Sequence, residues 1–259
     1  MSVNSYLTGL ANSAIVRDNE KVSISTSINN LQTNLSYSNS MFSSHFIFGS
    51  YSRGTILPRG IDENSDIDYM IEFKELGHKP QTYLNWLKTN IAEKYYSRSE
   101  IYQSHPTIVL ELNHIKFELV PAIKNSWGQL QIPAKATDYN DWIETDPTGF
   151  NIILTGANQR HNNFVKPLVR LVKRWNVNAG YPFESFDLEK RVVDSAFYGN
   201  TLLRDYFYDF ANSLTVNYTM AQWKNDKIKR LQKIVYDVSN LEKMGYVVDA
   251  ENKIKQLFL

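Results

Sequence analysis

Residues 45–73, HFIFGSYSRGTILPRGIDENSDIDYMIEF, hold two predicted strands joined by a polar loop. The first strand is a short apolar run, His45 to Phe48, which ends at a Gly49–Ser50 turn. The second carries Asp66 and Asp68. Because side chains i and i+2 of a strand point to the same face, the two carboxylates project together. They repel one another unless a cation lies nearby, and a hard divalent ion such as Mg²⁺ takes oxygen ligands of this kind.

The turn at Gly49 and Ser50 supplies a complementary feature. A strand followed at once by a helix or loop exposes backbone N–H groups that favour an anion. The Ser50 hydroxyl can add a donor, and Arg53 lies in the same segment. A lone D-x-D or Gly-Ser is most often an ordinary strand end or turn. A phosphate-binding turn followed by a metal-holding Asp pair, however, predicts a nucleoside triphosphate site.

These residues also carry a family resemblance. The string G-S-Y-S-R-G-T from Gly49 to Thr55, followed by S-D-I-D-Y from Ser65 to Tyr69, resembles the polymerase-β-like nucleotidyltransferase superfamily. The mark of that superfamily is G-S, a short spacer and D-x-D. The Arg53-Gly54-Thr55 extension is similar to its branch of oligonucleotide synthases and archaeal-type CCA-adding enzymes. The resemblance implies an α/β (α+β) fold, with a mixed sheet flanked by helices and a C-terminal helical lobe.

Length and composition limit the classes of protein. At 259 residues with 42% hydrophobic residues, the chain can form one large domain or two lobes with packed cores. It has no cysteine, which excludes disulfides and Cys-based zinc ribbons. Its net charge of +1 lacks the basic excess of strong nucleic-acid binders. With neither a signal-like start nor an apolar run of transmembrane length, we expect a cytoplasmic protein that does not enter a membrane.

Hydrophobic periodicity predicts the remaining organisation. Residues 19–39 and 80–98 have helical spacing, and the first helix is expected behind the sheet. Residues 107–112 and 115–120 predict a hairpin, with Pro121 ending its second strand. Beyond residue 152 the pattern is helical. We therefore predict a catalytic lobe with a long N-terminal helix over 1–150, and a helical lobe that closes the active-site cleft over 151–259.

Glu118 is a candidate third carboxylate. It lies on the polar face of the second hairpin strand, where Lys116, Glu118 and Val120 alternate with apolar residues. We expect this strand to neighbour the Asp66–Asp68 strand, and because adjacent strands lie about 4.8 Å apart, Glu118 could then reach the same metals. A strand glutamate is by itself most often solvated. The string F-E-L-V-P-A, however, resembles the third-carboxylate strand of the superfamily, where the usual acid is aspartate.

Residues 164–175, FVKPLVRLVKRW, are the clearest predicted helix. Apolar residues follow one face, and Lys166, Arg170 and Lys173 share another. A basic helix face is usually exposed to solvent, but such cations can also neutralise phosphate oxygens. Both interpretations fit the pattern.

This helix also indicates a branch of the superfamily. LVRLVKRW is similar to a helix of the 2′–5′-oligoadenylate synthetases and of the bacterial cyclic-oligonucleotide synthases called CD-NTases, and W-I-E-T-D-P (Trp142 to Pro147) is typical of that branch. The resemblance implies that Lys173 contacts donor phosphates. It also implies that Phe186, in E-S-F-D-L-E, stacks on the donor base; a core phenylalanine at a helix start is the alternative.

The resemblance implies a two-metal nucleotidyl transfer. Asp66 and Asp68 would hold the Mg²⁺ or Mn²⁺ that carries the triphosphate, and Glu118 would join them at a second ion and help to deprotonate the nucleophile. Gly49 and Ser50 would bind the donor phosphates, helped by Arg53, Lys166 and Lys173.

The expected product is a cyclic or linear oligonucleotide second messenger, as in antiviral defence signalling. The expected substrates are ATP, GTP or pyrimidine NTPs, and the expected partners include a protein or nucleic-acid activator. Three alternatives stay open: nucleotide addition to an RNA 3′ end, a nucleotidylating antitoxin, and a non-catalytic nucleotide-binding module. The balanced charge argues against the first, the second helical lobe against the second, and the complete acidic trio against the third.

Overall fold

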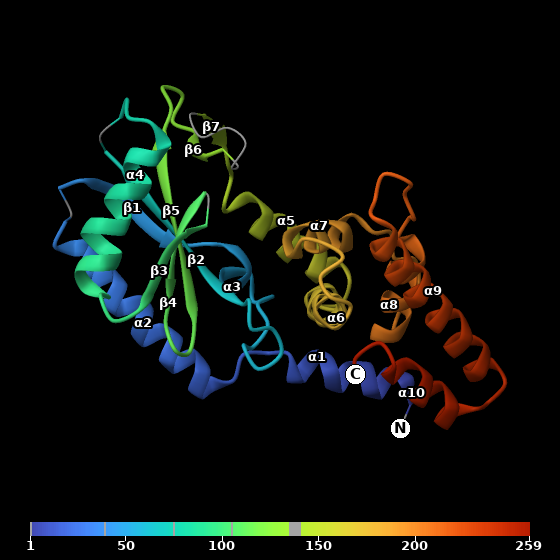
Figure 1. Ribbon diagram of the computed structural model, residues 1–259. Coiled ribbons are helices and arrows are strands. Elements are labelled where there is room, and N and C mark those ends of the chain that lie inside the picture. Colours follow the sequence, from blue (N-terminus) through green and yellow to red (C-terminus); the bar gives the residue numbers. More distant parts are fainter. Residues whose placement is uncertain (1, 39, 75, 105, 135–140) are drawn as a thin grey trace. The chain divides into compact units, whose positions relative to one another are not determined.

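The computed structural model describes residues 2–38, 40–74, 76–104, 106–134 and 141–259 (Figure 1). The chain packs into two compact units. The sheet unit comprises Val16–Arg59 and Glu63–Ile152, and the helical unit comprises Met1–Ile15, Gly60–Asp62 and Ile153–Leu259. This division differs from the predicted ranges 1–150 and 151–259, because Met1–Ile15 packs with the C-terminal helices.

The sheet unit contains a mixed sheet, as the family resemblance implies. Its strands lie in the order β1-β2-β5-β4-β3, and only β2 and β5 of these neighbours are parallel. Two further strands extend it, since β6 pairs with β5 and β7 with β6. The bounds are β1 Phe42–Ile47, β2 Asp66–Phe73, β3 Glu100–Ser104, β4 Thr107–Glu111, β5 Lys116–Lys124, β6 Leu130–Pro133 and β7 Trp142–Glu144.

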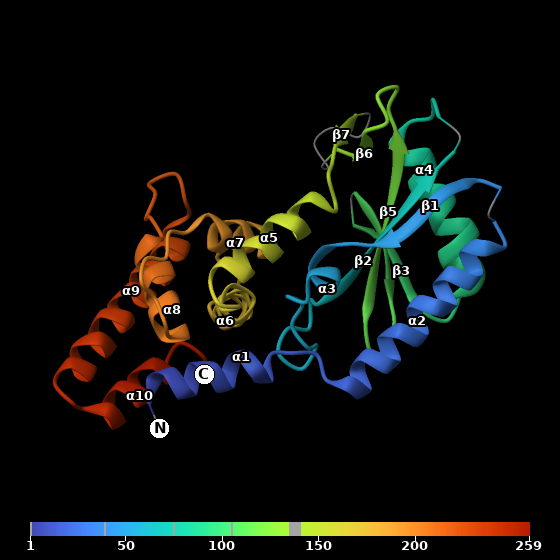
Figure 2. The same cartoon turned by 180° about the vertical axis from the view of Figure 1, so that it is seen from behind.

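Helices cover one face of this sheet. Both α2 (Asp18–Ser36) and α4 (Pro80–Leu87), which continues as a π-helix over Lys88–Glu93, lie on this side (Figures 1 and 2). Apolar residues of α2 and α4 pack there against alternate residues of β2, namely Ile67, Tyr69 and Ile71. The two helices predicted from periodicity are therefore present, and they form the main core with this face.

The other residues of β2 point to the opposite face of the sheet. Near the end of β2 they contribute Met70 to a small apolar cluster with Val120 and Ala122. Near its beginning the same face carries Asp66 and Asp68. The short helix α3 (Gly49–Arg53) connects β1 toward β2 on this side (Figure 1). The strand alternation thus separates the acidic residues from the main core.

One prediction about the sheet is wrong. Pro121 does not end β5, which continues to Lys124. On one side β5 pairs with β4 as far as Leu119 and with β6 from Ile123. Pro121 lies between these two partners, so the N–H that proline lacks is not required there.

The helical unit is built from both parts of the chain. Its helices are α1 Val3–Ser13, α6 Val165–Asn178, α7 Ser185–Asp194, α8 Leu203–Ser213, α9 Gln222–Lys243 and α10 Val247–Lys255, and α5 (Gly149–Arg160) leads into it from the sheet unit. The buried face of α1, with Val3, Leu7 and Ala11, packs among α6, α8 and α10. Within the described ranges, no helix combines the length and apolar character that crossing a membrane requires.

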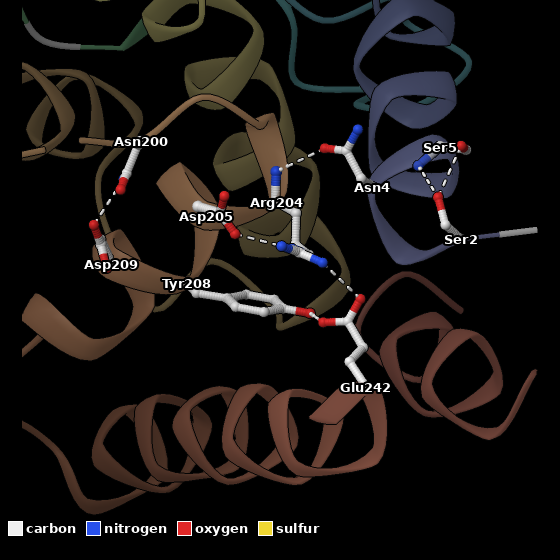
Figure 3. A network of polar contacts seen from close by, with 9 residues as sticks. All are labelled: Ser2, Asn4, Ser5, Asn200, Arg204, Asp205, Tyr208, Asp209 and Glu242. Carbon is white, nitrogen blue, oxygen red and sulfur yellow. Dashed lines mark hydrogen bonds and ion pairs between the residues drawn. The ribbon is translucent and has the colours of Figure 1, made fainter. Parts of the chain in front are cut away.

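Arg204 joins three of these helices (Figure 3). At the start of α8, its backbone N–H donates to Asn4 Oδ1 of α1 at 3.1 Å. Its guanidinium donates to Asp205 Oδ1 at 2.9 Å and to Glu242 Oε1 of α9 at 3.0 Å. The Tyr208 hydroxyl donates to the other oxygen of Glu242 at 3.0 Å. These polar contacts fix α1 and α9 against α8.

Candidate active site

The parallel pairing of β2 with β5 brings the predicted carboxylates together. Asp68 lies opposite Glu118 in the register, and Asp66 lies opposite Lys116. All four side chains therefore share one face of the sheet. The Lys116 ammonium is 3.5 Å from Asp66 Oδ2 and 3.7 Å from Glu118 Oε1. The prediction that Glu118 neighbours the Asp66–Asp68 strand is confirmed.

The surroundings of the Glu118 carboxyl group change its pKa. Burial, together with the negative charge of Asp66, raises the pKa of Glu118 to about 7, although Lys116 acts in the opposite direction. Its side chain is only 25% exposed. A carboxyl group with a pKa near neutrality is suited to exchange protons at physiological pH.

The chemistry of these side chains fits a hard divalent ion, because they offer carboxylate oxygens from two adjacent strands. Their present arrangement is not that of a formed metal centre. In the described part of the chain, no three His, Cys, Asp or Glu side chains converge so that they could hold a metal ion. Instead Asp66 and Glu118 both lie against Lys116. Sequence reasoning assigned no role to Lys116, although the alternation that singled out Glu118 places it on the same face.

Gly49 is required by the backbone and by Asp68. Its φ of +70° lies in the left-handed region, and a Cβ atom there would sit 1.7 Å from Asp68 Oδ2 and 2.9 Å from Asp68 Cβ. The residue before Gly49 is also held against β2, because the N–H of Phe48 donates to the carbonyl of Asp68 at 3.0 Å. The absence of a side chain at Gly49 therefore lets α3 begin directly against Asp68.

We expect Gly49→Ala to destabilise the sheet unit and displace Asp68. The matched control is Gly54→Ala, since Gly54 has a φ of +69° with nothing within 4 Å of the added Cβ. Both variants carry the left-handed strain of about 1–2 kcal/mol, and only Gly49→Ala adds overpacking, typically about 1–3 kcal/mol. Urea unfolding of both variants measures the difference. Equal losses of stability would mean that the contact with Asp68 relaxes without cost.

Ser50 and Arg53, two further predicted phosphate-binding residues, lie in α3. The carbonyl of Ser50 accepts hydrogen bonds from the N–H groups of Thr55 and Ile56, at 2.9 and 3.1 Å, which close the turn after the helix. Arg53 is buried, and its guanidinium lies 5.4 Å from the ring centroid of Phe150. Thus Gly49, Ser50 and Arg53 belong to one short segment against β2.

The helical unit holds the remaining predicted residues. Two of the three cations on the basic face of α6 are buried: the Arg170 Nε–H donates to the carbonyl of Ala11 at 3.2 Å, and Lys173 is buried. The Lys173 ammonium pairs with Glu189 of α7, whose side chain is fully buried. Lys166, at the start of α6, is partly exposed. The Lys173–Glu189 pair was not predicted, because nothing in the local sequence around Glu189 distinguishes it from a surface glutamate.

Phe186 lies in the first turn of α7 and is 45% exposed. The Lys190 ammonium is 5.0 Å from its ring centroid. The alternative of a core phenylalanine is not what the structure shows. An exposed aromatic ring beside a cation is compatible with base stacking, but its role stays a prediction.

Comparison with known proteins identifies the family. Residues 1–158 match the Second Messenger Oligonucleotide or Dinucleotide Synthetase domain, called SMODS. A probable cyclic nucleotide synthase of Bacillus cereus is 31% identical over 125 residues, which are 43% of this chain and 37% of that protein. The cyclic AMP-AMP-AMP synthase of an Acinetobacter species is 26% identical over 135 residues, 50% of this chain and 38% of that protein. The matches thus span well under half of both relatives.

The fold has solved counterparts. The structure of the Bradyrhizobium diazoefficiens CD-NTase CdnG, in complex with GTP, has a TM-score of 0.72 at 12% identity, covering 98% of this chain and 97% of that chain. At this identity the likeness shows the fold alone. The family match, by contrast, covers more than half of the sequence and includes Gly49, Asp66, Asp68 and Glu118. The chain therefore belongs to the SMODS family.

Proposed function

We propose that this chain is a nucleotidyltransferase that joins nucleoside triphosphates into a cyclic or linear oligonucleotide second messenger, used in antiviral defence signalling. One observation carries the proposal: Asp66, Asp68 and Glu118 share one sheet face directly beside the Gly49–Ser50 turn. Membership of the SMODS family and the names of the two matched relatives support it.

In this proposal the three carboxylates hold divalent ions, Mg²⁺ or Mn²⁺. Such ions, when bound, polarise phosphoryl oxygens and make a hydroxyl a better nucleophile. The protein's own groups accept the proton and donate hydrogen bonds. Glu118, which lies opposite Asp68 on the same sheet face, would accept the proton of the attacking hydroxyl. The backbone of α3 and the Ser50 hydroxyl donate hydrogen bonds to the phosphates of the donor nucleotide.

Further nucleotide contacts are proposed for Arg53, Lys166 and Lys173 toward phosphates and for Phe186 toward a base. For the residues of the helical unit the proposal rests on the family resemblance, and for Phe186 also on the exposure of its ring. Lys173 can bind phosphate only if it exchanges its present partner, Glu189. Replacing Lys173 therefore tests its ion pair with Glu189 and its proposed phosphate contact at the same time.

The proposed substrates are ATP, GTP or pyrimidine NTPs, and the proposed site of action is the cytoplasm. The relative from Bradyrhizobium binds GTP, and the relative from Acinetobacter is named for a product made of AMP units. An activating protein or nucleic acid is a further proposed partner, without which the purified chain could have low activity.

Addition of nucleotides to an RNA 3′ end is the second candidate. The observation in its favour is a row of exposed cations on α9, formed by Lys229, Arg230 and Lys233. A polyanionic acceptor bound there would release counterions, so its use would fall steeply with salt. The net charge of +1 argues against it, because strong nucleic-acid binders are clearly basic.

The assay that tests the proposed function uses free nucleotides. We expect purified protein with four labelled NTPs and Mg²⁺ or Mn²⁺ to make small oligonucleotides, with little change up to roughly 0.2 M salt, because few phosphates are contacted. Chromatography and mass spectrometry identify the products. No product from NTPs, together with salt-sensitive extension of an added RNA, would instead assign RNA tailing. Label transferred only to a protein partner would indicate the nucleotidylating antitoxin.

A further inference from the structure

Lys116 occupies a position among the carboxylates that the proposed mechanism does not use. We propose that its ammonium is a resident counter-ion of the site: it neutralises Asp66 and Glu118 while no divalent ion is bound, and a divalent ion must displace it. This inference rests on the proposed function in one respect, namely that the carboxylates hold such an ion. It makes Lys116 a positioning residue that sets how tightly the metal-free site takes up its first ion.

The sheet fixes Lys116 in this place. Its register partner on β2 is Asp66, and Glu118 follows it by two residues on β5. The ammonium lies between them, at 3.5 and 3.7 Å from their nearest oxygens. The Lys116 side chain is 14% exposed, less than Asp66 at 27% or Glu118 at 25%. A lysine buried more deeply than the acids around it is part of the site rather than a solvated surface residue.

The charges explain why a cation is needed there. Asp66 and Glu118 share one sheet face and both contact the Lys116 ammonium, so the two carboxylates are close enough to repel one another. The ammonium that contacts both offsets this repulsion. Without the ammonium, the folded protein would hold adjacent negative charges uncompensated.

The same contacts are weak enough to exchange. Both distances exceed the 2.7–3.2 Å of a good N–H···O hydrogen bond, so the contacts are electrostatic rather than tightly directed. Lysine is a compact charge on a flexible stem, which allows it to swing aside. A divalent ion close to Asp66 and Glu118 would repel the ammonium, so the two cations compete.

Metal binding to the nucleotide-free protein tests this competition directly. Titration of Mn²⁺, followed by calorimetry and by the loss of the free-ion electron spin resonance signal, should show about tenfold tighter binding to Lys116→Met than to the wild type. The metal-free variant should also melt at a lower temperature, and Mn²⁺ should raise its melting temperature more than that of the wild type. Lys116→Gln serves the same purpose if Lys116→Met does not fold.

Two controls separate a local effect from a general loss of positive charge. Lys124→Met removes a lysine of the same strand that pairs with Glu72 at 3.0 Å, outside the candidate site, and should leave Mn²⁺ affinity unchanged. Lys116→Arg keeps the charge and should bind Mn²⁺ as weakly as the wild type. If Lys116→Met and Lys116→Gln bind Mn²⁺ no more tightly than the wild type, or if neither the wild type nor these variants bind it, the inference is overturned.

The outcome is independent of the synthesis assay. A chain that makes no oligonucleotide from NTPs, yet binds Mn²⁺ more tightly as Lys116→Met, would contradict the proposed function and support the counter-ion role. If the chain makes oligonucleotides and Lys116→Met leaves the Mn²⁺ affinity unchanged, the proposed function is supported and the counter-ion role is contradicted.

Discussion

Replacing Asp68 with asparagine is expected to lower nucleotidyl transfer on the order of a thousandfold, the loss that follows when several kcal/mol of transition-state stabilisation by a divalent ion are removed. The substitution keeps the shape of the side chain, which touches the space above Gly49, and removes only its charge. Asp68 lies opposite Glu118 on β5, so a metal held between β2 and β5 would lose a ligand. Initial rates of product formation from labelled NTPs measure the effect.

The control for this experiment is Glu111→Gln. Glu111 lies on β4 beside Lys116 in the register, but its carboxylate is engaged by Arg59. This variant should retain activity within a few-fold of the wild type. Urea unfolding of the metal-free Asp68→Asn and Glu111→Gln proteins shows whether a loss of activity reflects a loss of fold. If Asp68→Asn is active and Glu111→Gln is inactive, the catalytic carboxylate lies on β4 rather than on β2.

Glu189→Gln is expected to destabilise the helical unit by about 3–5 kcal/mol, the usual consequence of removing one partner of a buried ion pair. Lys173 is 6% exposed and Glu189 is 0% exposed, so neither charge can turn to water in the folded state. The glutamine keeps the volume but leaves the Lys173 ammonium without its compensating charge. Urea unfolding followed by circular dichroism measures the loss of stability.

The double variant Lys173→Met/Glu189→Leu separates the pair from its surroundings. Removing both charges together should recover most of the stability, because apolar residues often replace a buried pair at little cost. If the double variant is as unstable as Glu189→Gln, the loss comes from packing rather than from an unpaired charge. In that case the loss of stability would be unrelated to any phosphate contact of Lys173.

Much of the sheet unit could be predicted because its signals are local. The alternation of Asp66 and Asp68 with Ile67 and Tyr69 placed the acids on one face and the core on the other, as the register and burial confirm. The G-S and D-x-D strings resemble the nucleotidyltransferase superfamily, and the Arg53-Gly54-Thr55 extension and the helix at 164–175 indicate oligonucleotide synthases, which the match to the SMODS family confirms. Glu118 could be placed beside them only because its strand resembled a known one; periodicity alone does not say which strands are neighbours.

What the sequence could not provide depends on contacts between distant segments. The basic face of α6 has the pattern of a solvated face, but α1 and α7 cover part of it with Ala11 and Glu189. Lys116 was visible on the polar face of its strand, yet its role follows only from the register with Asp66. The Lys173–Glu189 pair likewise joins two helices, and no local sequence pattern predicts that these helices pack together.

The position of α1 in the helical unit has a consequence for how the protein is made. On the ribosome α1 is synthesised before the whole sheet unit, whereas its partners α6, α8 and α10 follow that unit. Until they emerge, the apolar stripe of Val3, Leu7 and Ala11 has nothing to cover it and is a target for chaperones or for misassociation. Translation thus finishes the sheet unit before the partners of α1, and α1 is among the last of these elements to dock. A fragment that begins after α1 would expose the surface of α6, α8 and α10 that α1 covers, and should be poorly soluble for the same reason.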